Sequence, residues 1–583
     1  MSRTVADDLV EILVAAGVQR IYGLVGDSLN AFSDAIRRRG PSREGGIDWI
    51  HVHHEEAAAF AASAEAQLTG RLAVCAGSCG PGNTHLIQGV MDAHRSSAPV
   101  LVLASHIPSA NIGTGFFQET KPELLFGPAS HYCELVSQPE QLQRMTHVAV
   151  QNAVGKGGAA VLVIPGDILE AGSASEVRAN ALVTARPRPA PEPEAVTELA
   201  GRLNAARKVT IFAGTGAAGA REEVLQLAAL LHAPVGHSLR GKDVFGYDNP
   251  YDVGMTGLLG YGACYTALHG ADLLLMLGTD FPYVDFLPTA NNVQVDLDPS
   301  HLGRRAPIVQ GVAADVGLTL QALLPLIEPE RKHGFLDDML TQHQTLVRRG
   351  VHTYDHDPAE KQLIHPEYLA ALVDHEAAAD AVFTVDTGMD CTWAARYLTP
   401  NGQRRMIGSW VHGSMANALP MAVGAQVAYP GRQVVALSGD GGLAMLLGEL
   451  LTVKTHRLPV KVVVFNNSSL GMVRLEMLAA GDPPFETDHD AVDYGAIAAG
   501  AGFWSRHVED PVELPDAVAA FFAADGPALL DVVTDPNALS VPTHLTGAEV
   551  KGFAGSLSKV ALTGGVKEVW DIARSNLRNI PHP

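Results

Sequence analysis

One acidic and one amide side chain stand at matching positions in the last third of the chain. Asp440 lies between Gly439 and Gly441, and Asn467 ends an Asn-Asn pair that follows after 24 residues (442–465). A carboxylate and an amide oxygen suit Mg²⁺, which takes oxygen ligands and leaves positions for phosphate oxygens. The glycines let backbone N–H groups approach a phosphate at the start of a helix. We therefore expect a Mg²⁺ and phosphate site here, although two ordinary tight turns would leave the same residues.

The flanking segments are expected to bring the two side chains together. Gln433–Leu437 and Val460–Phe465 are apolar runs typical of buried strands, and Leu443–Val453 between them is typical of a helix. In a right-handed parallel crossover the C-terminal ends of both strands lie side by side. Asp440 and Asn467 can then reach one point in space.

The first and middle thirds repeat this alternation of strand and helix. Strands are predicted at Ile47–Val52, Leu72–Ala76, Val100–Ala104 and Lys208–Ala213, and helices over Glu55–Leu68 and from Gly80 onward. The alternation predicts the α/β class, with three doubly wound parallel-sheet domains and a short C-terminal helical tail. A GxGxxG sequence at Gly214–Gly219 follows the last of these strands, but alone it is as typical of a simple turn as of a nucleotide site.

Two segments divide the chain into thirds. Thr184–Pro193 is rich in proline and Arg348–Lys361 is polar, so both are predicted linkers. We expect domains over residues 1–183, 190–345 and 360–535, followed by a tail over residues 536–583.

The tail combines apolar residues at helical spacing with basic residues. The apolar positions are Val550, Phe553, Leu557, Val560, Ala561, Val566, Val569, Trp570, Ala573 and Leu577, and the basic ones are Lys551, Lys559, Lys567, Arg574 and Arg578. Such a pattern is typical of an amphipathic helix that lies in a membrane interface. A helix docked permanently on the body of the protein would show the same pattern.

Composition limits the partners and the compartment. The 583 residues include 63 acidic and 41 basic ones, for a net charge of −22, which argues against a nucleic-acid partner. Contact with an anionic membrane must then come from a local patch. The five scattered cysteines form no CxxC pair, as expected in a reducing cytoplasm. The first 20 residues are typical of an amphipathic helix rather than a signal peptide.

Seven further motifs follow one another along nearly the whole chain. They are Ile21–Asn30, His54–Glu56, Cys75–Asn83, Phe116–Thr120, Tyr251–Gly262, Leu277–Tyr283 and His412–Ala418. Together with the metal motif, their order and spacing resemble the thiamine diphosphate- and FAD-dependent pyruvate oxidase family, and most closely its quinone-linked members. The resemblance implies the thiamine diphosphate enzyme fold. In that fold the first domain binds the pyrimidine ring, the central domain binds FAD, and the third binds the diphosphate with Mg²⁺.

The resemblance also implies roles for single residues at the thiamine site. Glu55 matches the glutamate that activates the cofactor through N1′ of its aminopyrimidine, and Met415 matches the apolar residue that wedges between the two cofactor rings. Mg²⁺ ligation falls to Asp440, Asn467 and the backbone carbonyl of Ser469. From the residues alone, Glu55 would equally be an acid at a helix N-terminus, and Met415 a core methionine.

The other predicted site residues fall into three groups by the molecule that they would contact. Thiamine diphosphate would be lined by His412, Gly413, Ser414, Gly441, Gly442, Ser468, Leu470, Gly471 and Met472. Pyruvate would meet Phe117, Gln118, Val473 and Glu476, which could instead be a packed loop and a helix start. FAD would contact Thr256, Gly257, Leu258, Leu259, Thr279, Asp280, Phe281, Pro282, Tyr283 and Asp296, although Asp296 could also be a solvated turn acid.

The implied reaction is the oxidative decarboxylation of pyruvate to acetate and CO₂, with electrons passed through FAD to a membrane quinone, either ubiquinone or menaquinone. The alternatives are an oxygen-dependent pyruvate oxidase that makes acetyl phosphate, an acetolactate synthase-like carboligase with structural FAD, and a cofactor-binding regulatory protein without catalysis. In the family the thiamine site lies between two subunits, so a homotetramer is expected. The expected location is the cytoplasm, peripheral on the inner face of the cell membrane.

Overall fold

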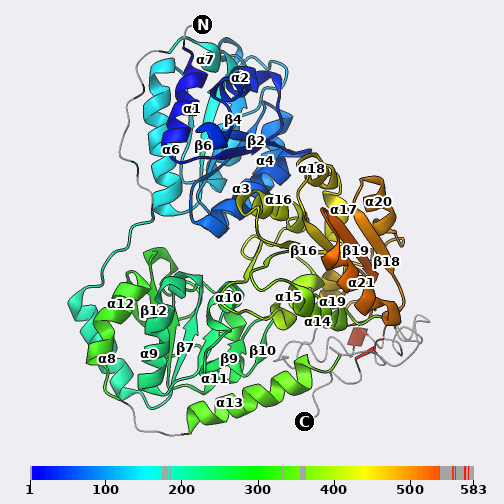
Figure 1. Cartoon of the computed structure of the whole chain (residues 1–583). Helices are drawn as coiled ribbons and strands as arrows, with labels where there is room; N and C mark the ends of the chain where they lie inside the picture. Colours follow the sequence, from blue (N-terminus) through cyan, green and yellow to red (C-terminus); the bar gives the residue numbers. More distant parts are fainter. Residues whose placement is uncertain are drawn as a thin grey trace.

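In the computed structural model the chain folds into three α/β domains, each built on its own sheet with helices on both faces (Figure 1). The predicted fold class is therefore confirmed. The structure describes residues 3–173, 177, 182, 185–329, 334–354 and 363–538, together with residues 555, 556, 559, 570, 572, 575 and 576. The predicted tail helices lie mostly outside the described residues.

The first sheet has six parallel strands in the order β2-β1-β3-β4-β6-β5. Its strands are β1 (Arg20–Gly23), β2 (Asp48–His51), β3 (Ala73–Gly77), β4 (Val100–His106), β5 (Cys133–Leu135) and β6 (Ala159–Pro165). Its helices are α1 (Val5–Ala15), α2 (Asn30–Arg39), α3 (Glu55–Thr69), α4 (Pro81–Arg95), α5 (Pro122–Phe126), α6 (Leu142–Lys156) and α7 (Gly166–Glu170). The strand order changes direction between β1 and β3, and open α/β sheets usually bind ligands at the carboxyl ends of strands at such a point.

The middle sheet has seven strands in the order β10-β9-β8-β7-β11-β12-β13, and only the β9–β10 pair is antiparallel. The strands are β7 (Val209–Ala213), β8 (Val235–His237), β9 (Asp252–Met255), β10 (Tyr261–Gly262), β11 (Leu273–Leu277), β12 (Asn292–Asp296) and β13 (Ile308–Ala313). The helices are α8 (Pro193–Ala205), α9 (Arg221–Leu231), α10 (Lys242–Phe245), α11 (Cys264–Gly270), α12 (Val316–Leu323) and α13 (Phe335–Leu346). The GxGxxG segment forms a 3-10 turn, Thr215–Ala220, before α9.

The third sheet has six parallel strands in the order β15-β14-β16-β17-β19-β18. The strands are β14 (Val382–Val385), β15 (Arg405–Gly408), β16 (Val434–Gly439), β17 (Lys461–Asn466), β18 (Trp504–Val508) and β19 (Ala528–Val533). The helices are α14 (Pro366–Glu376), α15 (Met389–Tyr397), α16 (Ala418–Ala428), α17 (Asp440–Met445), α18 (Glu449–Thr455), α19 (Gly471–Ala480), α20 (Tyr494–Gly500) and α21 (Leu514–Ala523).

The prediction of one continuous helix over Leu443–Val453 is wrong, because the structure has two short helices in this region. Helix α17 starts at Asp440, directly after β16, and ends at Met445; α18 starts at Glu449. Gly448 stands at the start of α18 and lowers the cost of interrupting the helix. The early start places Asp440 in the first turn of a helix, where backbone N–H groups have no carbonyl partner within the helix.

Helix α3 joins the first domain to the third. Its alanines favour the helix, His54 accepts a backbone N–H at its start, and Gly70 ends it in the left-handed conformation. The helix is buried along nearly its whole length, against α4 and against α16 of the third domain. Gly424 of α16 faces the backbone of Ala61, whose carbonyl oxygen would clash with any Cβ at that position. The two domains therefore share one tightly packed core.

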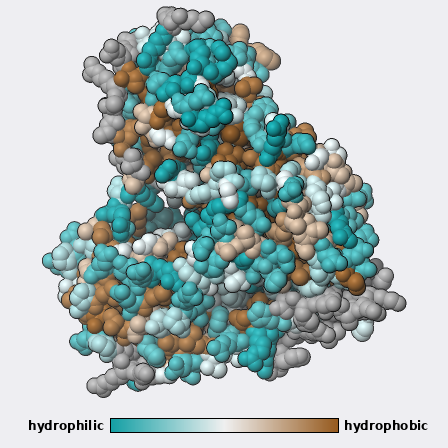
Figure 2. Space-filling view, in the orientation of Figure 1, coloured by the Kyte–Doolittle hydropathy of each residue, from teal (hydrophilic) through white to brown (hydrophobic). Residues whose placement is uncertain are grey.

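The described surface is mixed in polarity. Figure 2 shows hydrophilic and hydrophobic residues interspersed over the visible face of all three domains. Within the described residues, no helix is both long enough and apolar enough to span a membrane.

Candidate functional site

The Asp440 loop and the Asn467 loop meet at the carboxyl edge of the third sheet. They directly follow β16 and β17, which pair in parallel, as the crossover predicted. Asp440 is only 3% exposed. Its Oδ1 accepts the N–H of Gly441 at 2.8 Å, and its Oδ2 accepts the N–H of Ser468 at 2.6 Å. The second hydrogen bond ties the two loops together.

Three oxygens at this edge could hold Mg²⁺: the Asp440 carboxylate, the Asn467 amide oxygen and the Ser469 carbonyl. Asn467 Oδ1 accepts the N–H of Ser469 at 3.0 Å, and the Ser469 carbonyl accepts the N–H of Gly471 at 2.8 Å. Burial raises the pKa of Asp440 although nearby backbone N–H groups act to lower it. A bound cation would offset that cost of burial, so the donor set fits Mg²⁺. Its occupancy stays a prediction.

Two more buried acids lie beside these residues, and sequence reasoning missed both. Asp386 follows β14, and its Oδ1 accepts two N–H groups of Asn417 at 3.1 Å. Both carboxylate oxygens of Asp390 are buried and have no hydrogen-bond partner in the described part of the chain. Burial, together with the charges of Asp386 and Asp440, raises the pKa of Asp390. The signal for Asp386 was its place directly after the apolar run 381–385, as Asp440 stands directly after its own strand.

Several predicted cofactor residues are neighbours at the start of α17. A Cβ on Gly441 would lie 2.8 Å from Leu470 and 3.5 Å from Met415. A Cβ on Gly471 would lie 2.9 Å from the amide nitrogen of Asn467. Gly442 is packed against Asp386 so closely that only glycine fits, and Met472 packs on the core of the third domain. The glycines therefore permit close packing, whatever they bind.

The loop that carries His412, Gly413 and Ser414 contacts the first domain. Gln88 of α4 donates from Nε2 to Ser414 Oγ at 2.9 Å, and its Oε1 lies 3.3 Å from His412 Nε2. Gly413 adopts a φ of +77°, in the left-handed region that favours glycine. Gln88, which the sequence analysis did not single out, thus joins α4 to this loop.

Glu55 is the first residue of α3 and is 4% exposed. His85 of α4, another residue that sequence reasoning missed, places Nδ1 at 2.9 Å from Glu55 Oε2. The ring of His54 stacks on that of His85 with centroids 4.4 Å apart. On the other side, a Cβ on Gly82 would lie 3.0 Å from Glu55 Oε1. One carboxylate oxygen is therefore bonded to histidine, and the other faces Gly82 in the first turn of α4.

Glu55 and the metal-site residues belong to separate clusters within one chain. No hydrogen bond or ion pair between described residues joins Glu55 to Asp440, Asn467 or Ser469. The nearby acid from the third domain is instead Glu449 of α18, which accepts the N–H of His53 at 3.2 Å. Burial, with a contribution from the Glu55 charge, raises the pKa of Glu449 to about 7.

The predicted pyruvate contacts lie on two separate surfaces. Phe117 is 78% exposed, and Gln118, at a φ of +63°, lies with Oε1 3.4 Å from Cys79 Sγ. Val473 and Glu476 are exposed on α19. In the single chain the structure does not bring these two pairs together, and their roles stay predictions.

The predicted FAD residues gather at the carboxyl edge of the middle sheet. Gly257 has a φ of +101°, and a Cβ there would lie 2.9 Å from the Phe281 ring and 3.2 Å from Tyr283. The GxGxxG turn packs on the same place, since a Cβ on Gly214 would lie 2.7 Å from Thr279. Four strands, β7, β9, β11 and β12, end here, where open α/β sheets usually bind ligands.

Some polar atoms at the carboxyl edge of the middle sheet have hydrogen-bond partners and others do not, among the described residues. The hydroxyl of Thr256 is buried without a partner among the described residues, so a polar ligand atom would fit there. Asp296 Oδ1 accepts the N–H of Asp298 at 3.0 Å and lies 3.1 Å from His301 Nδ1. Arg304 and Arg305 both bind the Asp280 carboxylate. These structural ion pairs explain the acidic residue at this position.

The remaining predicted FAD residues differ in exposure. Pro282 is exposed, Leu258 is 37% exposed, and Leu259 packs against the core of the third domain. The binding of FAD by this edge of the sheet stays a prediction.

Two of the described residues of the tail, Ser556 and Lys559, lie against α19 or its C-terminal end. Ser556 Oγ donates to the Leu478 carbonyl at 2.9 Å, and Lys559 Nζ donates to the Gly481 carbonyl at 2.6 Å. Ile572 lines a small pocket together with Asn467. These tail residues thus reach the helix that follows the metal loop.

Comparison with known proteins identifies the class. Residues 3–124 match the N-terminal TPP binding domain of thiamine pyrophosphate enzymes, residues 196–323 their central domain, and residues 386–532 their C-terminal TPP binding domain. The chain therefore belongs to the thiamine pyrophosphate enzymes, whose cofactor is also called thiamine diphosphate.

Individual relatives extend over most of the chain. It is 31% identical over 534 residues to pyruvate oxidase of Lactiplantibacillus plantarum, covering 90% of this chain and 87% of that protein. It is 28% identical over 585 aligned positions to acetolactate synthase of Mycobacterium bovis, covering 97% and 93%. It is also 53% identical over 350 residues to an uncharacterised protein of Pseudomonas amyloderamosa, covering 60% and 87%.

Proposed function

We propose that this protein is a pyruvate:quinone oxidoreductase. Pyruvate and water are converted to acetate and CO₂, and two electrons with two protons reduce a membrane quinone to the quinol. The observation that carries the thiamine chemistry is the set of oxygens of Asp440, Asn467 and Ser469 that meet at the ends of β16 and β17. The pyruvate oxidase relative supports pyruvate as the substrate.

The residues of the first and third domains take complementary parts. Asp440, Asn467 and the Ser469 carbonyl hold Mg²⁺, and the N–H groups at the start of α17 face the phosphates. Glu55 would hold a proton next to the pyrimidine ring of the bound cofactor, and Met415, which lies near Gly441, would pack against the cofactor. Bound thiamine diphosphate supplies the electron sink for loss of CO₂.

The middle domain holds FAD at its carboxyl edge. Gly257 and Gly214 let the loops of this edge pack closely on one another, and the buried hydroxyl of Thr256 is available to bond the ligand. Asp296, with one oxygen already bonded, keeps the other for a ribose hydroxyl.

The assembly and the membrane contact complete the proposal. The pyruvate-side residues Phe117 and Val473 are exposed in the single chain, which supports a site completed by a second subunit within a homotetramer. The apolar and basic pattern of the tail supports peripheral attachment to the inner face of the cell membrane, where ubiquinone or menaquinone accepts the electrons.

An acetolactate synthase-like carboligase is the second candidate, because the relative of that name spans nearly the whole chain. In that case FAD would be structural and its oxidation state would not change. An oxygen-dependent pyruvate oxidase would instead reduce O₂ and release acetyl phosphate when phosphate is present.

The test is anaerobic addition of pyruvate to protein loaded with thiamine diphosphate, Mg²⁺ and FAD, followed by a soluble quinone. Bleaching of the flavin absorbance and its recovery on quinone, with acetate as product, are expected. Release of CO₂ with acetolactate and no bleaching would establish the carboligase. In a parallel aerobic reaction with added phosphate, acetyl phosphate as the product would establish the oxygen-dependent oxidase.

A further inference from the structure

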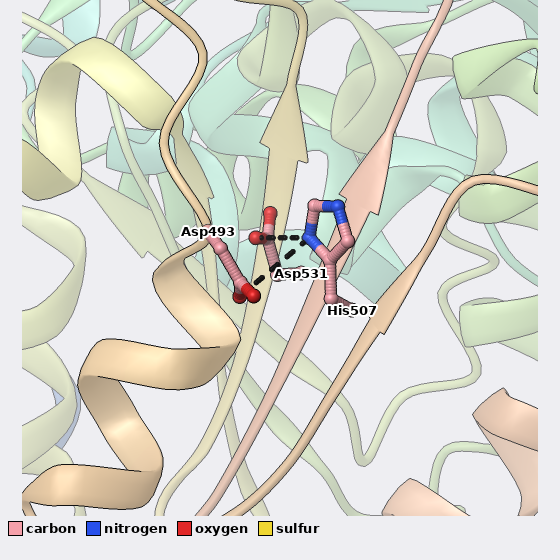
Figure 3. Close-up of side chains that lie close together, drawn as sticks. All are labelled: Asp493, His507 and Asp531. Carbon is pink, nitrogen blue, oxygen red and sulfur yellow. Dashed lines mark hydrogen bonds and ion pairs between the residues drawn. The ribbon is translucent and has the colours of Figure 1, made fainter.

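Asp531 of β19 lies at the centre of a buried hydrogen-bond network in the third domain. The residue is completely buried. Its Oδ1 accepts from Asn466 Nδ2 at 2.9 Å, and its Oδ2 accepts from the backbone N–H of Tyr494 at 2.8 Å and from His507 Nδ1 at 2.7 Å. Figure 3 shows the His507 ring turned toward both Asp531 and Asp493, with the same ring nitrogen facing the two carboxylates. One carboxylate thus joins β17, β18, β19 and the start of α20.

Two arms of this network lead to the two halves of the metal site. Asn466 is the residue before Asn467, and its amide also donates to the Val492 carbonyl at 2.9 Å. The hydroxyl of Tyr494 donates to the backbone carbonyl of Asp440 at 3.1 Å. Asp531 therefore reaches the Asn467 loop through Asn466 and the Asp440 loop through Tyr494.

The three side chains in Figure 3 do not themselves form a metal site, although their ligand atoms lie within 4.8 Å of one another. Asp493 caps α20 by accepting the N–H of Ala496 at 2.7 Å. The Asp531 carboxylate already accepts three N–H groups, and one of these donors is His507 Nδ1. Burial lowers the pKa of His507, but the hydrogen bond and charge of Asp531, together with Glu509 and Asp493, more than offset this effect, so the pKa is raised. A structural ion pair explains the cluster.

We infer that Asp531, together with Asn466, Tyr494 and His507, is a positioning device for the metal and diphosphate site. The inference rests on the thiamine and Mg²⁺ site of the proposed function and assigns it residues outside the ligand set. Partners that orient metal ligands from behind change metal affinity about 10- to 100-fold when they are removed. Asp531 orients both ligand-bearing loops at once, so its loss should act on the metal rather than on pyruvate.

The test measures metal and cofactor binding to the full-length protein after removal of both. Mg²⁺ is titrated at saturating thiamine diphosphate, and thiamine diphosphate at saturating Mg²⁺, by calorimetry. Asp531→Asn turns an amide N–H toward one of the groups that now donate to the carboxylate, and it should raise the Kd for Mg²⁺ about 10- to 100-fold. Tyr494→Phe removes only the hydroxyl that bonds the Asp440 carbonyl, so it should raise the Kd for Mg²⁺ by a smaller factor. In the double variant the Kd for Mg²⁺ should rise by less than the product of the two single fold-changes, because both residues belong to one hydrogen-bond network.

The matched control is Asp493→Asn, which removes the charge beside His507 but keeps a good helix cap. It should leave both dissociation constants unchanged. If Asp531→Asn does not fold, Tyr494→Phe decides alone, since it deletes only the bond to the Asp440 carbonyl. Folded variants with lower thermal stability but a wild-type Kd for Mg²⁺ would overturn the inference. A wild-type protein that binds no thiamine diphosphate with Mg²⁺ would instead overturn the proposed function itself.

Discussion

At the scale of single residues, Glu55 is oriented by its own domain. His85 bonds one carboxylate oxygen, and the stacked ring of His54 restrains His85. A buried carboxylate needs such bonds because burial without a partner is costly. The other oxygen, next to Gly82, is thereby left for a partner from outside the domain.

Replacing Glu55 with Gln should lower kcat for pyruvate oxidation at least about 100-fold, because proton sharing with the cofactor is lost while the shape is kept. Flavin content per subunit should not change, since the predicted FAD residues lie in the middle domain. Pyruvate-dependent reduction of a soluble quinone and the flavin absorbance measure the two effects. Glu56→Gln is the control and should stay active. Unchanged turnover in Glu55→Gln would contradict the assignment.

At the scale of elements, the α3–α16 contact holds the first and third domains together. It depends on the missing side chain of Gly424, which lets α16 approach the backbone of Ala61. Interiors packed this closely do not absorb an added methyl group without moving.

Gly424→Ala should therefore destabilise the protein by about 1–3 kcal/mol, although alanine is the better helix former. Thermal unfolding followed by circular dichroism would measure the change. Gly500→Ala, at a helical position where a Cβ meets nothing within 4 Å, is the control and should be neutral or slightly stabilising. Equal effects of the two substitutions would disprove the steric argument.

Glu449 makes the contact between α18 and the turn before α3 dependent on pH. Burial raises its pKa to about 7 from an ordinary value of 4.5. Between these values the folded chain keeps a proton that the unfolded chain releases. The stability that this proton contributes is complete below pH 4.5 and is lost as pH rises through 7.

The wild type should therefore lose more stability between about pH 4.5 and about pH 8 than Glu449→Gln does, by roughly 3 kcal/mol, since one pKa unit is worth about 1.4 kcal/mol. Urea unfolding at several pH values would show the difference between the two proteins. Glu513→Gln, at an exposed ion pair, should follow the wild type. Parallel curves for wild type and Glu449→Gln would show that Glu449 does not carry the effect.

At the scale of the whole molecule, large apolar side chains remain exposed near the predicted site. Phe117 is 78% exposed, Phe485 73% and Met445 60%. Exposed apolar groups of this size often mark surfaces that another protein covers. A second copy of the chain is the partner that the proposed two-subunit site requires.

Mixing two inactive variants would test that arrangement. Glu55→Gln and Asp440→Asn chains, denatured together and refolded, form mixed oligomers. If each site takes Glu55 from one subunit and Asp440 from another, a mixed pair has one site with both defects and one intact site, so activity should return. Each variant refolded alone is the control. Absence of recovery in verified mixed oligomers would place both residues in one chain.

The sequence alone predicted the class and the strands, because alternation of apolar strands and helices is a local property. The strands predicted before Asp440 and Asn467 are present within two residues of their expected bounds, and so the two loops meet. The exact helix after Asp440 was not predicted, since an interruption near Gly448 leaves the apolar pattern unchanged.

Only the tertiary structure revealed the partners of these residues. His85 lies 30 residues from Glu55 in the chain, and Asp531 lies 65 from Asn466. No local pattern links such pairs, because the packing of helices and the order of strands decide which side chains meet. The sequence thus determined which residues could do the chemistry and on which strand ends they lie. The fold decided what holds them there, since buried polar groups must find their partners across the chain.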